Sequence, residues 1–227
     1  YKEILADLLT PVSALLKVED GYSYLLESVE GEEKIARFSF LGFEPVMLFI
    51  SKGNSIELIR EGRKKVFSTD SPLKEIADIM SGFKPAFVKG ILRFSGGMVG
   101  YMGYDFVRFF ENIPDKNPDE LGLPDSFFMM AKSHVIFDHS ARKIQIVVNV
   151  HMEKRGEKIK NIEKLYNEAL DKIEKITKRL NSPPVRPRLK KRKKKTHKIE
   201  SNFTKKEFED CVRKAKRYIR SGDIIQV

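Results

Sequence analysis

The chain has 227 residues, of which 41% are hydrophobic, so it can bury the core of one large domain or two modest ones. This composition is typical of a globular protein and excludes a disordered chain. The single cysteine, Cys211, excludes an internal disulfide and fits a reducing cytoplasm. No apolar run reaches the roughly 18 residues that a membrane span needs, and no signal-peptide pattern opens the chain. We therefore expect a soluble, cytoplasmic protein without a membrane partner.

The net charge of +11 is concentrated in one stretch. Nine Lys and Arg residues lie between Pro183 and Ile199 with no acid among them, which leaves +2 for the rest of the chain. Three prolines and the lack of an apolar period predict a solvated linker over residues 182–202. Nucleic-acid binding by this stretch is the alternative, but the aromatic side chains of single-strand binders are missing from it. Binding that weakens steeply with salt would favour that alternative.

The first 70 residues predict one short helix followed by strands. Thr10-Pro11 is typical of a helix cap and first turn, and the helix is expected to end at Val18. Residues rich in β-formers and separated by turn residues such as Gly53-Asn54 predict strands over 22–29, 34–41, 46–52, 55–60 and 64–68.

The next segment mixes helices, loops and glycines. Ser71-Pro72 predicts a helix through Met80, and a strand is expected over 90–94. Gly96, Gly97, Gly100 and Gly103 follow without the register of a phosphate-binding loop. We interpret these glycines as places where backbones approach closely in a crowded turn. A short helix over 104–111 and an extended loop over 114–125 come next.

The second half predicts a hairpin and two helices. Two β-rich runs, 127–137 and 142–151, are joined by the turn residues Asp138-His139-Ser140-Ala141. Apolar residues three and four apart over 157–180 predict one long helix, which packs on the sheet or, alternatively, on a coiled-coil partner. A capping box at Thr204 opens a last helix, and Ile224 to Val227 predict the first residues of a strand.

These elements predict an α+β fold made mainly of antiparallel, sandwich-like β-sheet with flanking helices. We expect a sheet domain over residues 1–152, the long helix packing on it over 153–181, the basic linker over 182–202, and the start of a second domain over 203–227.

One cluster of possible metal ligands lies in the hairpin. His134 and Asp138 share one face of a strand, and His139 is adjacent. No third ligand is near, so we interpret these residues as ordinary strand and turn positions. No Ser-His-Asp triad or carboxylate pair can be specified from the sequence, and no catalytic residue is assigned.

Several motifs, taken in order, resemble one family. Three of them are residues 22–29 with Leu25-Leu26-Glu27-Ser28 at their centre, residues 37–42, which begin Arg37-Phe38-Ser39, and Leu121-Gly122-Leu123-Pro124-Asp125. The remaining segments are 10–14, 96–105 and 218–227. Together they resemble the amino-terminal region of anthranilate synthase component I, the large subunit that uses chorismate.

The resemblance implies a reaction and its partners. Chorismate and ammonia, the latter from glutamine through a partner amidotransferase subunit, become anthranilate and pyruvate with Mg²⁺, as a step of tryptophan biosynthesis. The family's chorismate and Mg²⁺ residues lie in a carboxy-terminal domain beyond Val227, so the 227-residue chain is expected to be inactive by itself. The large subunit of aminodeoxychorismate synthase is the alternative within the family.

The resemblance also implies a feedback site for L-tryptophan. It maps to Leu26, Glu27 and Ser28, with Arg37 as a further contact. Strand alternation places Ser28 on the same face as Leu26, with Glu27 on the other. We expect the Ser28 hydroxyl to face the ligand, while Glu27 contributes through its backbone or from a local bulge. The alternative is that these are ordinary strand residues.

Overall fold

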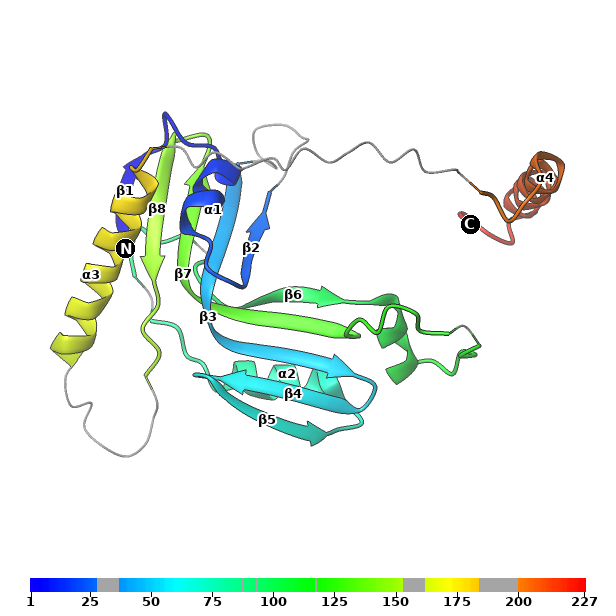
Figure 1. Cartoon of the computed structure of the whole chain (residues 1–227), viewed down its shortest axis with the longest axis horizontal. Helices are drawn as coiled ribbons and strands as arrows, with labels where there is room; N and C mark the ends of the chain where they lie inside the picture. Colours follow the sequence, from blue (N-terminus) through cyan, green and yellow to red (C-terminus); the bar gives the residue numbers. More distant parts are fainter. Residues whose placement is uncertain (28–36, 87, 93, 117, 153–161, 184–199) are drawn as a thin grey trace. The chain divides into compact units, whose positions relative to one another are not determined.

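The computed structural model describes residues 1–27, 37–86, 88–92, 94–116, 118–152, 162–183 and 200–227 (Figure 1). The chain forms two compact units, residues 1–186 and 187–227. The strands of the first unit are β1 (Lys2–Leu5), β2 (Ser23–Leu26), β3 (Phe38–Lys52), β4 (Ser55–Arg60), β5 (Arg63–Ser68), β6 (Met98–Met102), β7 (Ser126–Asp138) and β8 (Lys143–Val148). Its helices are α1 (Pro11–Val18), α2 (Pro72–Ser81), the 3₁₀ helix η1 (Tyr104–Phe109) and α3 (Ile162–Leu180).

All eight described strands belong to one antiparallel sheet. Its order is β1-β8-β7-β3-β4-β5, with β2 paired to β3 and β6 paired to β7. The long strands β3 and β7 run side by side through its centre and bend together midway (Figure 1). The predicted α+β class with mainly antiparallel sheet is confirmed. The strands expected separately over 34–41 and 46–52 are one continuous strand, β3, in the described part of that range.

The bend of β3 is held by Glu44. Its backbone lies in the left-handed region (φ 57°), which is uncommon for a residue other than glycine, and the pairing of β3 with β7 shifts between Pro45 and Met47. The Glu44 carboxylate accepts a 2.7 Å hydrogen bond from the Ser133 hydroxyl and forms an ion pair with Lys172 of α3. These contacts stabilise a backbone conformation that is otherwise strained.

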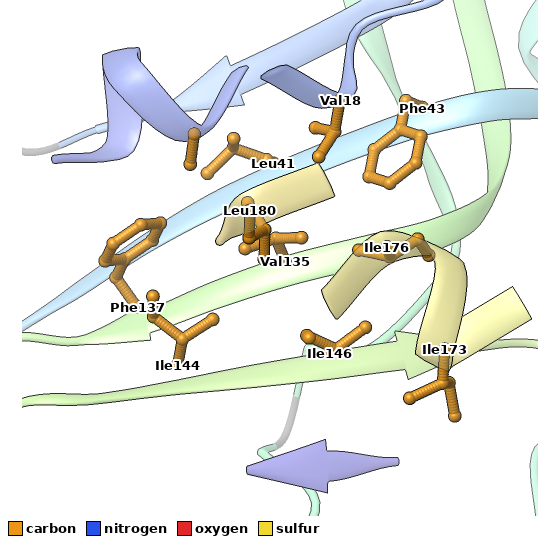
Figure 2. Close-up of a cluster of buried hydrophobic side chains, with 11 residues drawn as sticks. Val18, Leu41, Phe43, Val135, Phe137, Ile144, Ile146, Ile173, Ile176 and Leu180 are labelled. Atoms are coloured by element: carbon orange, nitrogen blue, oxygen red, sulfur yellow. The ribbon is translucent and has the colours of Figure 1, made fainter. Parts of the chain in front are cut away.

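The main hydrophobic core lies between the sheet and the helices α1 and α3 (Figure 2). Each strand contributes alternate residues, because successive side chains of a strand point to opposite faces. The buried side chains are Ala14 and Val18 of α1, Leu41 and Phe43 of β3, Val135 and Phe137 of β7, Ile144 and Ile146 of β8, and Ile173, Ile176 and Leu180 of α3.

Only the second half of α3 is buried in this core. Ile173, Ile176 and Leu180 of the predicted stripe are buried, whereas Tyr166 is 61% exposed. The C-terminus of α3 is capped from α1, because Lys17 Nζ donates to the main-chain oxygen of Leu180 at 2.6 Å. The residues before 162 that the helix prediction included lie outside the described part.

The predicted strand over 90–94 is wrong for the residues described there. Gly90 lies in a turn with φ 93°, and the Gln145 side chain bonds the backbone on both sides of Ile91. Gln145 Nε2 donates to the Gly90 oxygen at 2.8 Å, and Leu92 N–H donates to Gln145 Oε1 at 3.4 Å. This backbone is therefore satisfied by a side chain and not by a neighbouring strand.

The glycine segment contains a strand that the pattern did not predict. Met98–Met102 is β6, paired with β7 so that Gly100 lies opposite Phe128. A Cβ atom at Gly100 would lie 1.8 Å from the Phe127 oxygen, so the close approach of two backbones is confirmed there. The short helix predicted after it is the 3₁₀ helix η1, and it ends at Phe109.

The described part of the second unit contains α4 (Lys205–Ser221). Its capping box is confirmed, because Glu207 N–H donates to the Thr204 hydroxyl and the Glu207 carboxylate accepts from the Thr204 N–H. Gly222 ends the helix at φ 82°. The strand expected from Ile224 is wrong, since residues 223–227 form none, and a strand needs a neighbour for its backbone hydrogen bonds. Among the described helices, none is both long and apolar enough to cross a bilayer.

Candidate functional site

The candidate site lies at the end of β2. This strand pairs with β3 from Ser23 opposite Phe43 to Leu26 opposite Phe40, and with no other described strand. An edge strand directs one row of backbone N–H and C=O groups away from its sheet. Leu26 is 43% exposed and Glu27 is exposed, so both are accessible at this edge. Ser28 lies outside the described residues.

The two faces of β2 have different surroundings. Leu25 packs into the core beneath α1 and α3. Leu26 lies on the opposite face, where its partner Phe40 contacts Phe38 (ring centroids 6.1 Å apart) and Phe94 (5.2 Å, edge to face). Leu26 therefore lies beside an aromatic cluster, defined by Phe38, Phe40 and Phe94, that offers an apolar wall.

Arg37, immediately before β3, is held by the end of β7. Its Nε and Nη2 atoms donate to the two carboxylate oxygens of Asp138 at 3.0 and 2.7 Å, a bidentate pair. The guanidinium also lies 4.8 Å from the centre of the Phe38 ring. Asp138 thus positions Arg37. Within the part of the chain that the structure describes, Nη1 donates no hydrogen bond, so it can donate to a further anion.

The ion pair makes this corner sensitive to acid. The Arg37 guanidinium, which donates hydrogen bonds to the charged carboxylate, holds the pKa of Asp138 below its usual value. A carboxyl whose pKa is lowered by folding stabilises the protein above its unfolded pKa of about 3.9, and that stabilisation is lost as the pH falls through the lower folded value.

Replacing Arg37 by Gln is expected to raise the pKa of Asp138 toward its ordinary value, because its strongest donor is removed. Carboxyl ¹³C chemical shifts followed through a pH titration measure this. Lys52→Gln is the matched control: it should raise the pKa of Asp119, whose largest perturbation is the Lys52 hydrogen bond, and leave Asp138 unchanged. An Asp138 titration that is the same in Arg37→Gln would contradict the assignment.

The possible metal ligands of the hairpin do not converge. His134 is 1% exposed within the sheet, Asp138 is engaged by Arg37, and His139 Nε2 is hydrogen-bonded to the Ser39 hydroxyl at 2.8 Å. In the described ranges no group of three or more His, Cys, Asp or Glu side chains could hold a metal ion. His134 and Asp138 belong to strand β7, and His139 lies in the turn that follows it.

Two surface cavities lie away from Leu26 and Glu27. The larger, about 420 Å³, lies between the bend of β3 and α3 and is lined by Glu44 and Lys172 with other charged residues. The smaller, about 260 Å³, lies between the residues after β1 and the β7–β8 turn. Charged side chains line both cavities beside apolar ones. The candidate site is placed at the exposed edge of β2 because that edge carries the predicted site residues Leu26 and Glu27.

Comparison with known proteins then places the chain in a family. The family described as chorismate binding enzyme matches residues 22–227. The chain belongs to the chorismate binding enzyme family. The match begins just before β2 and includes the candidate site.

Curated relatives support a narrower resemblance. The chain is 38% identical to anthranilate synthase component 1 of Acetivibrio thermocellus over 99% of its own length and 46% of that relative's. It is 36% identical to anthranilate synthase component 1 of Aquifex aeolicus over 100% of its length and 45% of that relative's. The resemblance indicated by the motifs is confirmed, and the chain spans less than half the length of these relatives.

A solved structure shows the same fold. Anthranilate synthase component I from Streptococcus pneumoniae is similar with a TM-score of 0.55 and 23% sequence identity. The similarity covers 98% of this chain and 46% of that one.

The sequence pattern does not indicate two of the residues that form the site, Asp138 and Phe94. The motif Arg37-Phe38-Ser39 marks the start of β3, but nothing in the pattern indicates that Asp138, 101 residues away, engages Arg37. Phe94 belongs to a segment predicted as a strand, yet it packs on Phe40 as part of a loop. Only the pairing of β3 with β7 could have indicated the first contact.

Proposed function

We propose that this chain is part of the large subunit of an anthranilate synthase. The observation that carries the proposal is the similarity to proteins named anthranilate synthase component 1 along almost the whole chain. The proposed reaction converts chorismate and ammonia, released from glutamine by a partner amidotransferase subunit, to anthranilate and pyruvate. The relatives' names favour this product over the aminodeoxychorismate of the alternative.

The Mg²⁺ implied by the resemblance does not fit the described residues, because no group of three or more possible ligands is assembled among them. No step of the reaction is therefore assigned to these residues. The role proposed for this region is binding.

The proposed ligand is L-tryptophan, acting as feedback inhibitor at the end of β2. An amino acid needs acceptors for its ammonium group, donors for its carboxylate and apolar walls for its side chain. The free backbone row of β2 supplies acceptors, the Arg37 guanidinium supplies donors, and Leu26 with the aromatic cluster supplies the walls. Ser28, which follows Glu27 in the sequence, is expected from the resemblance to face the ligand.

The test uses a property of the composition. The chain contains no Trp, so added L-tryptophan is the only indole in the sample. Its fluorescence anisotropy is expected to rise on titration with the protein, because the bound ligand tumbles with a much larger particle. Ser28→Phe is expected to abolish the rise by filling the site.

Ser55→Phe is the matched control, because Ser55 is an exposed serine at the start of β4 that pairs with Lys52 of β3, whereas β2 pairs with residues 40–43 at the other end of that strand. It should bind as the unaltered protein does. A flat titration of the unaltered chain, or equal binding by Ser28→Phe, would contradict the site.

A further inference from the structure

Two polar side chains face each other across the middle of the sheet. Tyr24 of β2 pairs with Gly42 of β3, and Gly42 pairs with His134 of β7. The three residues therefore form one row on the same face. A Cβ atom at Gly42 would lie 2.2 Å from Cε1 and Cζ of Tyr24, so the tyrosine ring lies directly over the glycine. The Tyr24 and His134 rings are tilted by 61°, with centroids 6.4 Å apart.

Both polar ends are closed off from solvent. The Tyr24 hydroxyl and both ring nitrogens of His134 are buried and have no hydrogen-bond partner among the described residues. Phe94 and Ser95 cover part of this face. The Phe94 ring packs edge to face on Phe40, and Asn149 Nδ2 donates to the Ser95 oxygen at 2.7 Å. Buried polar groups of native proteins are almost always paired with protein or with ordered water.

Both groups are neutral at physiological pH. Burial lowers the pKa of His134 to about 4, and burial also raises the pKa of the Tyr24 hydroxyl. A neutral imidazole has one N–H donor and one acceptor nitrogen, and a phenol can both donate and accept. Two such groups, each lacking a partner, suit a ligand that donates and accepts at once.

We propose that a single water molecule is bound between the Tyr24 hydroxyl and a ring nitrogen of His134. Two hydrogen bonds of about 2.8 Å that meet at a water join polar atoms about 4.5 Å apart, which is compatible with the separation of the two rings. The water would link the edge strand β2 to the central strand β7 by hydrogen bonds that pass over Gly42. It is a structural site distinct from the proposed tryptophan contacts.

Tyr24→Phe tests the proposal, because the variant should lower the unfolding free energy if the water is present and should not lower it if the water is absent. If the water is present, the variant loses one partner of a buried hydrogen bond, and the equilibrium constant for unfolding in urea should rise about fivefold. If no water is present, the variant removes an unsatisfied hydroxyl, and stability should stay the same or increase. The second result would overturn the proposal. Tyr22→Phe is the control, since Tyr22 is 52% exposed and should show no change.

A second measurement locates the water itself. In the unaltered protein, the ring protons of Tyr24 and His134 should both show nuclear Overhauser contacts to a long-lived water, and Tyr24→Phe should remove the contact at His134. A direct hydrogen bond between the two rings without such a water would overturn the proposal. In a double-mutant cycle with His134→Leu, the two effects should couple by about fivefold, whereas strictly additive effects would contradict the bridge.

Discussion

Replacing His134 by Leu is expected to make the stability of the protein much less sensitive to pH between 6.5 and about 4, the ordinary and the folded pKa of this side chain. Burial lowers the pKa because it penalises the charged imidazolium, and a weaker repulsion from His151 acts in the same direction. Above pH 6.5 His134 is neutral in both states. As the pH falls below 6.5, His134 becomes protonated in the unfolded chain but stays neutral in the folded protein, so the unfolding free energy decreases as the pH falls.

The expected loss from this group is roughly 3 kcal/mol of unfolding free energy across that range, at about 1.4 kcal/mol for each unit by which the pKa shifts. Urea unfolding at a series of pH values, in the unaltered protein and in His134→Leu, measures it as the difference between two curves. The carboxylates titrate in both proteins and cancel in that difference.

His151→Leu is the comparison variant. The pKa of His151 is also lowered by burial, but this side chain is only partly buried, so its removal should flatten the curve less. Parallel curves for the unaltered protein and His134→Leu would show that His134 is not held neutral by the fold.

Gly100→Ala is expected to destabilise the protein by about 3 kcal/mol or more, because overpacking against an element that cannot yield costs that much. The added Cβ would lie 1.8 Å from the Phe127 oxygen and 2.6 Å from the Phe128 Cα. Both are backbone atoms of β7, so no side chain can rotate away to make room. The variant must separate β6 from β7 or distort the central strand, and thermal or urea unfolding measures the loss.

Gly82→Ala is the matched control. Gly82 follows α2 in a helical conformation (φ −70°), and the nearest atom to an added Cβ, the Ile79 oxygen, is 3.3 Å away. This substitution should change the unfolding free energy by no more than about 0.5 kcal/mol. Similar midpoints for Gly100→Ala and Gly82→Ala would contradict the close backbone approach of β6 and β7.

Local chemistry made several elements predictable. Gly53-Asn54 marks the turn between β3 and β4, and Thr10 and Thr204 mark the starts of α1 and α4. A turn residue or a cap acts on a backbone only a few positions away, so its effect can be read from neighbouring residues. The strand predicted over 90–94 failed for the opposite reason, since its backbone partner is the side chain of Gln145.

In the candidate site, too, some features follow from neighbouring residues and others depend on residues far apart in the sequence. The antiparallel hairpins, the resemblance to the family and the segment that contains Leu26 and Glu27 can be recognised from local residue patterns. The ion pair of Arg37 with Asp138, and the approach of Tyr24 to His134 across Gly42, are visible only in the folded chain. These contacts join residues about a hundred positions apart, and they exist because β3 and β7 pair in one register. A hydrophobic pattern shows which face of a strand is buried, but not which strand lies beside it, so these partners could be found only in the folded chain.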